Sequence, residues 1–258
     1  MDRETLAASV TGTAAQLRLQ LSDITAASQM LEQTTSEDRA RAYLAVLNQG
    51  ICRMLRTVGQ MELLNRLTEE DEIRVFPVPT DLGVWTRELA EHAREILLGA
   101  RVSLEYRGPK VLMATVDQGL VQQMLLELIC VAAQPGGEVS LSLAKQEDTA
   151  CFTVCGTGTQ IPPEDLVQLL FPREETLPSS WGLPLARQIA ELHGGSLVAG
   201  TVNGARAALV AALPLRLDLP VSHLDSPSRL YASGGFCAEL VAFSQILPTD
   251  SFTPEALE

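Results

Sequence analysis

The sequence predicts an α+β fold in which a long antiparallel helical hairpin is followed by an α/β sandwich. Residues 3–34 contain one glycine and no proline, and this stretch and residues 37–67 both repeat apolar residues at spacings of three and four, as amphipathic helices do. From residue 75 onward, short apolar runs typical of strands alternate with helical segments. We therefore expect a hairpin dimerisation domain over 1–70, a sandwich domain over 71–217 and a tail over 218–258 with one short helix.

The two helices of the hairpin are expected to meet at a tight turn, because Ser36 followed by acidic residues is a helix start signal. A single hairpin cannot cover its own apolar stripe, so pairing with a second copy into a four-helix bundle is the expected solution. The alternative is that the stripe packs on the rest of the same chain. The residues expected at the dimer interface are Leu17, Leu21, Ile24, Leu31, Leu47, Ile51, Leu55 and Val58.

The second domain is expected to begin with a short strand at 75–78 and a helix over 81–100. Further helices are expected over 117–134, ended by Pro135 and Gly136, and over 181–193. Hairpins are expected over 101–117, around Gly108-Pro109, over 138–155, and over 195–215 with a turn at Asn203-Gly204. This order favours a mixed sheet with helices on one face. In the tail, residues 236–247 predict a short helix that docks on its own sandwich, with docking on a partner as the alternative.

Composition excludes several classes of partner. The formal net charge is −13 and no basic run is present, which argues against binding to nucleic acid. No stretch is long and apolar enough to span a bilayer, and no signal peptide is visible, so no membrane partner and a cytoplasmic location are expected. The five cysteines form no metal-binding pattern and are expected to be reduced thiols, without a metal site.

Three motifs in a fixed order carry a resemblance to a known family. They are VDQGLVQQMLLELICVAAQ, IPPEDLVQLLF and WGLPLARQIAELHGGSLVAGTVNGARAALVAALPL. With the hairpin before them, they resemble the core of a sensor histidine kinase: a dimerisation and phosphotransfer hairpin, then an ATP-binding domain of the GHKL type over about residues 73–215. The architecture is also similar to bacterial histidine phosphotransferases that have a degenerate ATP domain.

The positions that carry nucleotide chemistry in this family differ here. The two asparagines that the family uses to bind magnesium fall on Glu127 and Val131; Glu127 could bind a metal, although a solvated charge is the expected reading. The aspartate that reads adenine falls on Gly156, which has no side chain for this task. No cofactor is expected at the degenerate pocket positions, which are Glu127, Val131, Gly156, Gly158, Ser180 and Gly182.

The phosphoacceptor histidine of the family falls on Ala15, and neither hairpin helix contains a histidine. His92 is expected to be at the surface or half-buried, and His223 lies in the tail. His193 is expected to close its helix as a cation, followed by Gly194 as the left-handed cap. No catalytic residue is therefore expected, and the chain resembles a pseudo-histidine kinase.

The resemblance implies a non-catalytic, dimeric two-component signalling scaffold that binds a response regulator or a similar protein through its helical bundle. Alternatives are a nucleotide-sensing module with residual ATP or ADP binding, and a phosphotransferase or phosphatase acting on a response regulator, for which Gln16 or Gln20 could orient water. The residues expected to contact the partner are Ala15, Arg18, Leu19, Ser22, Met61 and Glu62.

Overall fold

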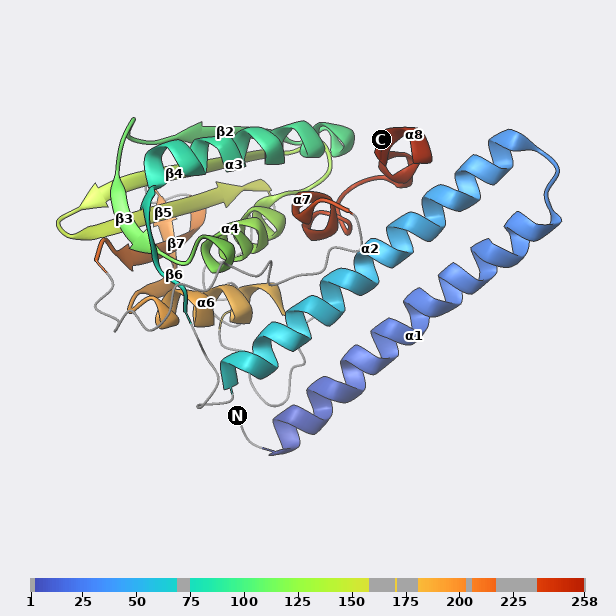
Figure 1. Cartoon of the computed structure of the whole chain (residues 1–258), viewed down its shortest axis with the longest axis horizontal. Coiled ribbons are helices and arrows are strands. Elements are labelled where there is room, and N and C mark those ends of the chain that lie inside the picture. Colours follow the sequence, from blue (N-terminus) through green and yellow to red (C-terminus); the bar gives the residue numbers. More distant parts are fainter. Residues whose placement is uncertain are drawn as a thin grey trace.

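The computed structural model describes residues 3–68, 75–157, 170, 181–202, 206–216 and 236–257. Helices α1 (Arg3–Gln33) and α2 (Glu37–Thr68) form an antiparallel hairpin, and the elements that follow form an α/β sandwich beside α2 (Figure 1). The α+β fold class expected from the sequence is confirmed.

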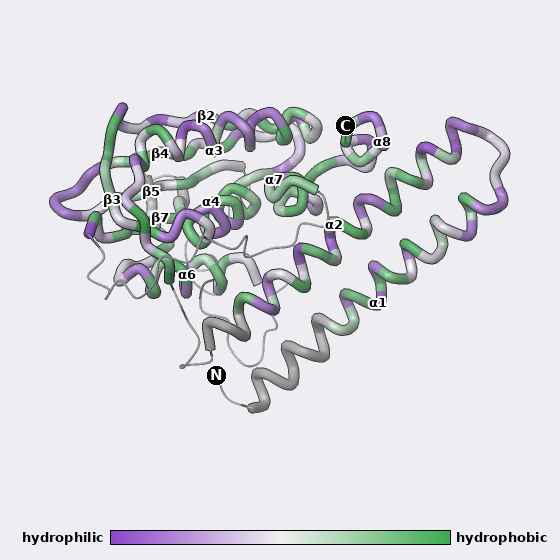
Figure 2. The backbone as a smooth tube through the Cα atoms, in the orientation of Figure 1, coloured by the Kyte–Doolittle hydropathy of each residue, from purple (hydrophilic) through white to green (hydrophobic). Residues whose placement is uncertain are grey.

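The hairpin helices lie close together because a glycine stands where they cross. A Cβ added to Gly50 of α2 would lie 2.7 Å from the Cγ1 atom of Ile24 of α1, so no larger residue fits without movement. Hydrophobic and hydrophilic residues alternate along both helices (Figure 2). This pattern gives α2 two apolar faces, one toward α1 and the other, which includes Ala45, Cys52 and Leu63, toward the rest of the chain.

The sandwich contains a five-stranded mixed sheet in the order β2-β4-β5-β7-β6 and a separate two-stranded sheet. The strands of the larger sheet are β2 (Ser103–Arg107), β4 (Glu138–Gln146), β5 (Thr149–Gly156), β6 (Ser196–Val202) and β7 (Arg206–Pro214). The smaller sheet pairs β1 (Val78–Asp81) with β3 (Met113–Val116).

Two of the three predicted hairpins pair as expected from the sequence. Strand β4 is antiparallel to β5, and β6 is antiparallel to β7, although Asn203 and Gly204 lie outside the described residues. The hairpin predicted around Gly108-Pro109 is wrong. Strand β2 instead pairs in parallel with β4, and β3 pairs with β1. The strand predicted at 75–78 is also shifted, since β1 begins at Val78.

Three helices of the sandwich begin or end at residues with clear capping roles. These are α3 (Leu82–Leu97), which continues as the short helix η1 (Leu98–Ala100), α4 (Gln118–Ala132) and α6 (Gly182–Leu192). Asp81 caps α3 by accepting hydrogen bonds from Gly83 and Val84, and Asp117 caps α4 by accepting one from Leu120. Gly194, with φ of 69°, provides the left-handed residue after α6.

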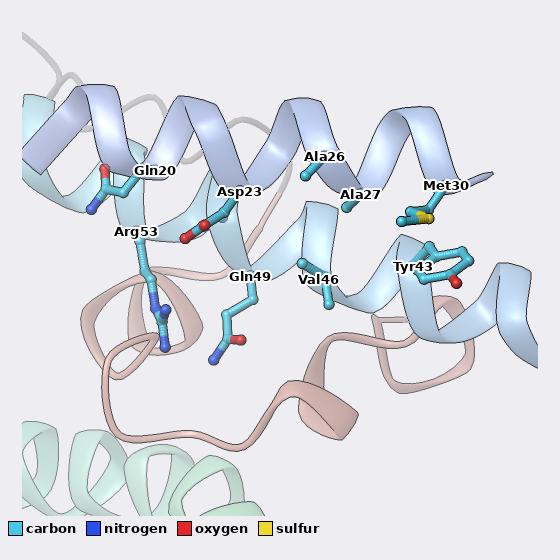
Figure 3. Close-up of a pocket in the computed structure, with 10 residues that line it drawn as sticks. Gln20, Asp23, Ala26, Ala27, Met30, Tyr43, Val46, Gln49 and Arg53 are labelled. Carbon is cyan, nitrogen blue, oxygen red and sulfur yellow. The ribbon is translucent and has the colours of Figure 1, made fainter. Parts of the chain in front are cut away.

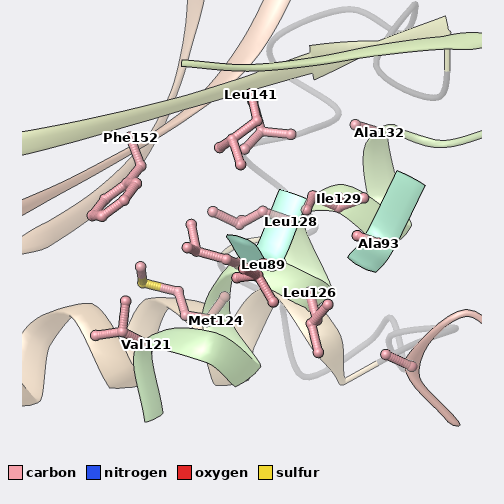
Figure 4. Close-up of a cluster of buried hydrophobic side chains, with 14 of the residues drawn as sticks. Leu89, Ala93, Val121, Met124, Leu126, Leu128, Ile129, Ala132, Leu141 and Phe152 are labelled. Carbon is pink, nitrogen blue, oxygen red and sulfur yellow. The ribbon is translucent and has the colours of Figure 1, made fainter. Parts of the chain in front are cut away.

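The core of the sandwich lies between the sheet and α3 and α4. Figure 4 shows Leu141 and Phe152 projecting from the sheet toward side chains of α4, with Leu89 and Ala93 of α3 nearby. Leu141 and Phe152 are fully buried, as are most apolar side chains of α4. This packing fixes α4, the helix that carries the candidate site, on the sheet.

The C-terminal segment, residues 236–257, forms α7 (Ala238–Ala242), η3 (Thr249–Phe252) and α8 (Pro254–Leu257). It contacts α3 and α4 of the sandwich, and also α2 of the hairpin (Figure 1). The expected docking on the sandwich is therefore confirmed, and the contact with α2 of the hairpin is an addition to it. The predicted helix over 236–247 is confined to the five residues of α7.

Candidate functional site

The candidate site is the region of the sandwich that the degenerate pocket positions define. Glu127 and Val131 lie one turn apart on α4, Gly156 is the last residue of β5, and Gly182 is the first residue of α6. Helices α4 and α6 are in contact, so these positions belong to one region. Gly158 and Ser180 lie outside the described residues.

Glu127 is fully buried, and among the described residues its carboxylate is hydrogen-bonded by three other side chains. One carboxylate oxygen lies 2.5 Å from Nη2 of Arg56, and the other accepts hydrogen bonds from Nε2 of Gln60 at 2.7 Å and Nε2 of Gln123 at 2.8 Å. Expecting a solvated charge at Glu127 was wrong, because α2 packs over this part of α4. Both oxygens that a metal would need are already engaged.

Arg56 and Gln60 come from the hairpin, one helical turn apart on α2. Only 3% of the Arg56 side chain is exposed, so the ion pair with Glu127 is shielded from solvent. The Nε and Nη1 atoms of Arg56 are buried without a hydrogen-bond partner in the described part of the chain. Burial raises the pKa of the neighbouring Cys130 thiol despite the nearby Arg56, and this thiol is therefore uncharged at neutral pH.

Gly156 stands where no side chain can fit. A Cβ built on this residue would lie 2.5 Å from the carbonyl oxygen of Ala132 and 2.6 Å from that of Glu138. Both contacts are with backbone atoms, which cannot rotate away as a flexible side chain can. The position that the family resemblance assigns to an adenine-reading aspartate is thus closed to aspartate by the backbone around it. Val131, half-buried, offers no oxygen ligand either.

His193 joins α6 to the start of α4 through its ring. Its Nε2 atom accepts a hydrogen bond from the backbone N–H of Asp117 at 3.1 Å, and its Nδ1 atom lies 2.8 Å from the carbonyl oxygen of Ile189. The proton therefore resides on Nδ1. Burial lowers the pKa of His193, and its role as a cation at the helix end, expected from the sequence, is corrected to that of a neutral, buried connector. His92 is exposed, as expected, and His223 lies outside the described residues.

The residues expected to form a dimer differ in their exposure. Leu21, Ile51 and Val58 are 48%, 39% and 38% exposed, which is high for large apolar side chains. The others are half-buried: Leu17, Ile24, Leu31, Leu47 and Leu55. The expected partner-binding residues Ala15, Arg18, Leu19, Ser22 and Glu62 are exposed, and Met61 is half-buried.

A pocket of about 330 Å³ lies between α1 and α2 (Figure 3). At one end Met30 of α1 faces Tyr43 of α2, and at the other Gln20 and Asp23 lie near Arg53. The small side chains of Ala27 and its neighbours leave this space open. The remaining lining residues are Ala26, Val46, Gln49 and Gly50.

The sequence did not point to Arg56, Gln60 or Gln123 as partners of Glu127. One signal was present: Cys52, Arg56, Gln60 and Leu63 recur at spacings of three and four, which marks a second buried face of α2. Within the described ranges, no three histidine, cysteine or acidic residues gather closely enough to hold a metal ion. None of the helices described is both long and apolar enough to cross a membrane.

The chain is similar in sequence to known histidine kinases. Residues 116–217 match the family model described as histidine kinase-, DNA gyrase B- and HSP90-like ATPase. The histidine protein kinase DivJ of Caulobacter vibrioides is 27% identical over 183 residues, which cover 65% of this chain and 31% of DivJ. The chain spans less than half the length of the curated relatives it matches.

Solved structures show the same fold at low sequence identity. The Acinetobacter baumannii histidine kinase AdeS superposes with a TM-score of 0.60 at 16% identity, over 78% of this chain and 97% of the AdeS chain. Histidine kinase ThkA, solved in complex with the response regulator protein TrrA, also gives a TM-score of 0.60 at 16% identity, over 80% of this chain and 60% of that chain. Each of these two superpositions covers more of this chain than the sandwich and the tail contain together. Both therefore include part of the hairpin.

Proposed function

We propose, from the histidine kinase-like GHKL core that the chain carries, that it acts as a non-catalytic, dimeric signalling scaffold. In this proposal the chain does not phosphorylate itself. It binds a response regulator or a similar protein through the helical hairpin and contributes to two-component signalling by that contact alone. The two-component, histidine kinase-like character rests on the comparisons, and the lack of catalysis rests on the site.

One observation carries the proposal: Glu127, at the position of a magnesium-binding asparagine, is neutralised by Arg56 of the hairpin. Magnesium that bridges nucleotide phosphates requires free oxygen ligands in near-octahedral geometry. Both carboxylate oxygens of Glu127 are occupied by side chains of this chain, and freeing them would leave Arg56 buried without a counter-charge. The Glu127 carboxylate is therefore not free to bind a magnesium ion.

The hairpin supports the proposal from a second direction. The three histidines of the sequence are His92, His193 and His223, and all lie outside the two hairpin helices. Ala15, at the expected phosphoacceptor position, is exposed on α1, and its methyl group has no atom that can accept a phosphoryl group. Autophosphorylation of the usual kind would thus have no nucleophile.

Exposed apolar residues of the hairpin support the dimer. Leu21 of α1 and Ile51 and Val58 of α2 are exposed on helices that are 31 and 32 residues long, and a second copy would cover them in a four-helix bundle. The solved ThkA structure contains a kinase together with a response regulator. For this chain, we propose that the exposed residues Ala15, Arg18, Leu19 and Ser22, with Met61 and Glu62, form the matching docking surface.

Nucleotide titration tests the proposal. ATP or ADP with magnesium, added to the purified chain, is expected to give no heat of binding and no shift in melting temperature. A ligand at 100 times its Kd would stabilise the fold by about 2.7 kcal/mol, which a thermal scan detects readily. The ATP-binding domain of a catalytically active histidine kinase serves as the positive control.

A saturable shift with either nucleotide would overturn the non-catalytic reading and favour the nucleotide-sensing alternative. Incubation with radiolabelled ATP, and separately with a phosphorylated receiver domain, tests the phosphotransferase and phosphatase alternatives. We expect no label on the chain and no loss of phosphate from the receiver. Gln20, one candidate for orienting water, is only 8% exposed, which disfavours the phosphatase alternative.

A further inference from the structure

The C-terminal segment, residues 236–257, is wedged between the hairpin and the sandwich. On one side it contacts α2, and on the other it contacts α3 and α4 (Figure 1). The segment thus touches both domains at the place where Arg56 and Glu127 join them. Binding of a partner to the hairpin does not require a segment that contacts both domains, so these contacts call for a separate explanation.

Hydrogen bonds from α2 hold the backbone of the segment. Nε2 of Gln49 donates to the carbonyl oxygens of Ser244 at 3.3 Å and Leu247 at 2.9 Å, and Oε1 of Gln49 accepts from the Thr249 hydroxyl at 2.9 Å. Arg53 donates to the same Ser244 carbonyl at 3.2 Å. Gln49 is only 7% exposed, so these bonds are shielded from water and their loss would leave buried acceptors unpaired.

Apolar anchors fix the segment as well. Phe243 and Phe252 are fully buried and belong to the same continuous core as the sandwich residues. On the sandwich side, the Gln122 amide donates to the Glu239 carboxylate at 3.2 Å, and the Cys130 thiol lies 3.5 Å from the Ala242 carbonyl oxygen. One segment therefore binds both domains with large, well-packed side chains.

The helices of the segment are too short to be stable by themselves. Helix α7 has five residues, and η3 and α8 have four each. Isolated helices of this length are not populated in water, because the cost of forming the first turn is not recovered. The order of residues 236–257 therefore depends on docking, and loss of docking would release the whole segment at once.

We propose that residues 236–257 form a releasable strap, which fixes the sandwich against α2 while docked and frees the sandwich to leave α2 when it opens. The docked strap keeps the Arg56–Glu127 pair covered and the two domains in one orientation. A protein that competes for the same face of α2, around Gln49 and Arg53, would shift the chain to the open form. The strap would thereby give this fold a switch that does not depend on a nucleotide.

Native-state hydrogen exchange on the full chain tests the proposal. The amides of Val241, Phe243 and Leu247, which are bonded within the strap, are expected to exchange through a local opening. Amides of β4 and β5 are expected to exchange only through global unfolding. Exchange of both groups through the same global opening would overturn the proposal.

Gln49→Ala in the full chain is expected to speed exchange of the strap amides at least about tenfold, since it removes the partner of the Leu247 carbonyl and of the Thr249 hydroxyl and one of the two donors to the Ser244 carbonyl. Exchange in β4 and β5 is expected to stay unchanged. Gln245→Ala, at an exposed residue of the strap, is the matched control and is expected to have no effect. An equal increase in every element, or none in the strap, would contradict the proposal.

Small-angle scattering supplies a second readout, in which Gln49→Ala is expected to increase the radius of gyration and Gln245→Ala is not. Both measurements are made without nucleotide or partner. Their outcome is therefore independent of the nucleotide titration that tests the proposed scaffold function, and either proposal can fail while the other stands.

Discussion

The guanidinium group of Arg56, on α2, and the carboxylate of Glu127, on α4, form a buried ion pair between the hairpin and the sandwich. The two residues are 71 positions apart in the sequence. Gln60 and Gln123 complete the hydrogen bonds of the carboxylate, so the pair is supported from both helices. The site thus links two domains where the family resemblance places a metal ligand.

Removing one partner of this pair is expected to destabilise the fold strongly. Arg56→Met leaves the Glu127 carboxylate buried without a counter-charge, and loss of a buried partner typically costs about 3–5 kcal/mol. The double variant Arg56→Met/Glu127→Leu is expected to recover most of this loss, because neither charge remains. Urea unfolding gives the free energies. Arg107→Met, which breaks the exposed pair with Glu105, is the control and is expected to change stability by less than about 1 kcal/mol. Equal effects of Arg56→Met and Arg107→Met would contradict the role of burial.

A side chain at Gly156 is expected to strain the end of β5. Gly156→Ala places a Cβ against two backbone carbonyls, and overpacking of this kind costs about 1–3 kcal/mol. Gly200→Ala is the matched control in β6, because its Cβ would meet no atom within 4 Å. Melting temperatures are expected to fall for Gly156→Ala and to stay nearly constant for Gly200→Ala. Gly156→Asp, the substitution that restores the family residue, is expected to melt lower still and to gain no affinity for ATP.

Stability is expected to fall as the pH drops below about 6.5, the ordinary pKa of histidine, because of His193. Burial lowers the pKa of this ring in the folded state, so the unfolded chain binds more protons in this range. The free energy of unfolding therefore rises with pH until the unfolded histidine is neutral. Unfolding by urea at pH 5 to 8 measures the slope. His193→Gln is expected to reduce the slope, and His92→Gln, at an exposed residue, is expected to leave it unchanged.

A charge at an exposed apolar residue of the hairpin is expected to break the proposed dimer. Ile51→Glu places a carboxylate where the second copy would bury an apolar side chain, and an unpaired buried charge is costly. Sedimentation equilibrium is expected to show a large shift toward the monomer. Leu98→Glu, on the sandwich at a residue that is 64% exposed, is expected to leave the association constant unchanged. A wild-type chain that sediments as a monomer would refute the dimer itself.

Local signals in the sequence predict the helices and the tight strand pairs well. Asp81, Asp117 and Gly194 mark helix boundaries through caps that are encoded within a few residues, and the polar turn between β4 and β5 fixes their register. The hairpin predicted around Gly108-Pro109 was wrong, because a turn signal in the sequence does not determine which distant strand each of the two segments pairs with. Strand β2 pairs with β4, and β3 with β1, across intervening elements.

The sequence did not predict the environment of the candidate site. The family resemblance pointed to Glu127 and Gly156, but the pairing of Glu127 with Arg56 depends on how α2 lies against α4. The charge state of His193 likewise depends on burial and on the N–H of Asp117. Such features arise from contacts between residues far apart in the sequence, which periodicity and spacing do not encode.

The strap also sets an order of events during folding. Three side chains of α2, those of Asn48, Gln49 and Arg53, form hydrogen bonds with strap residues that lie 191 to 204 positions later in the sequence. The hairpin and sandwich are synthesised before residues 236–257. The faces of α2 and α4 that these residues bury are therefore exposed to solvent until the end of synthesis. Contacts at such separation close slowly. The newly made chain therefore passes through a stage in which this apolar junction is open, when chaperones or a second copy can reach it.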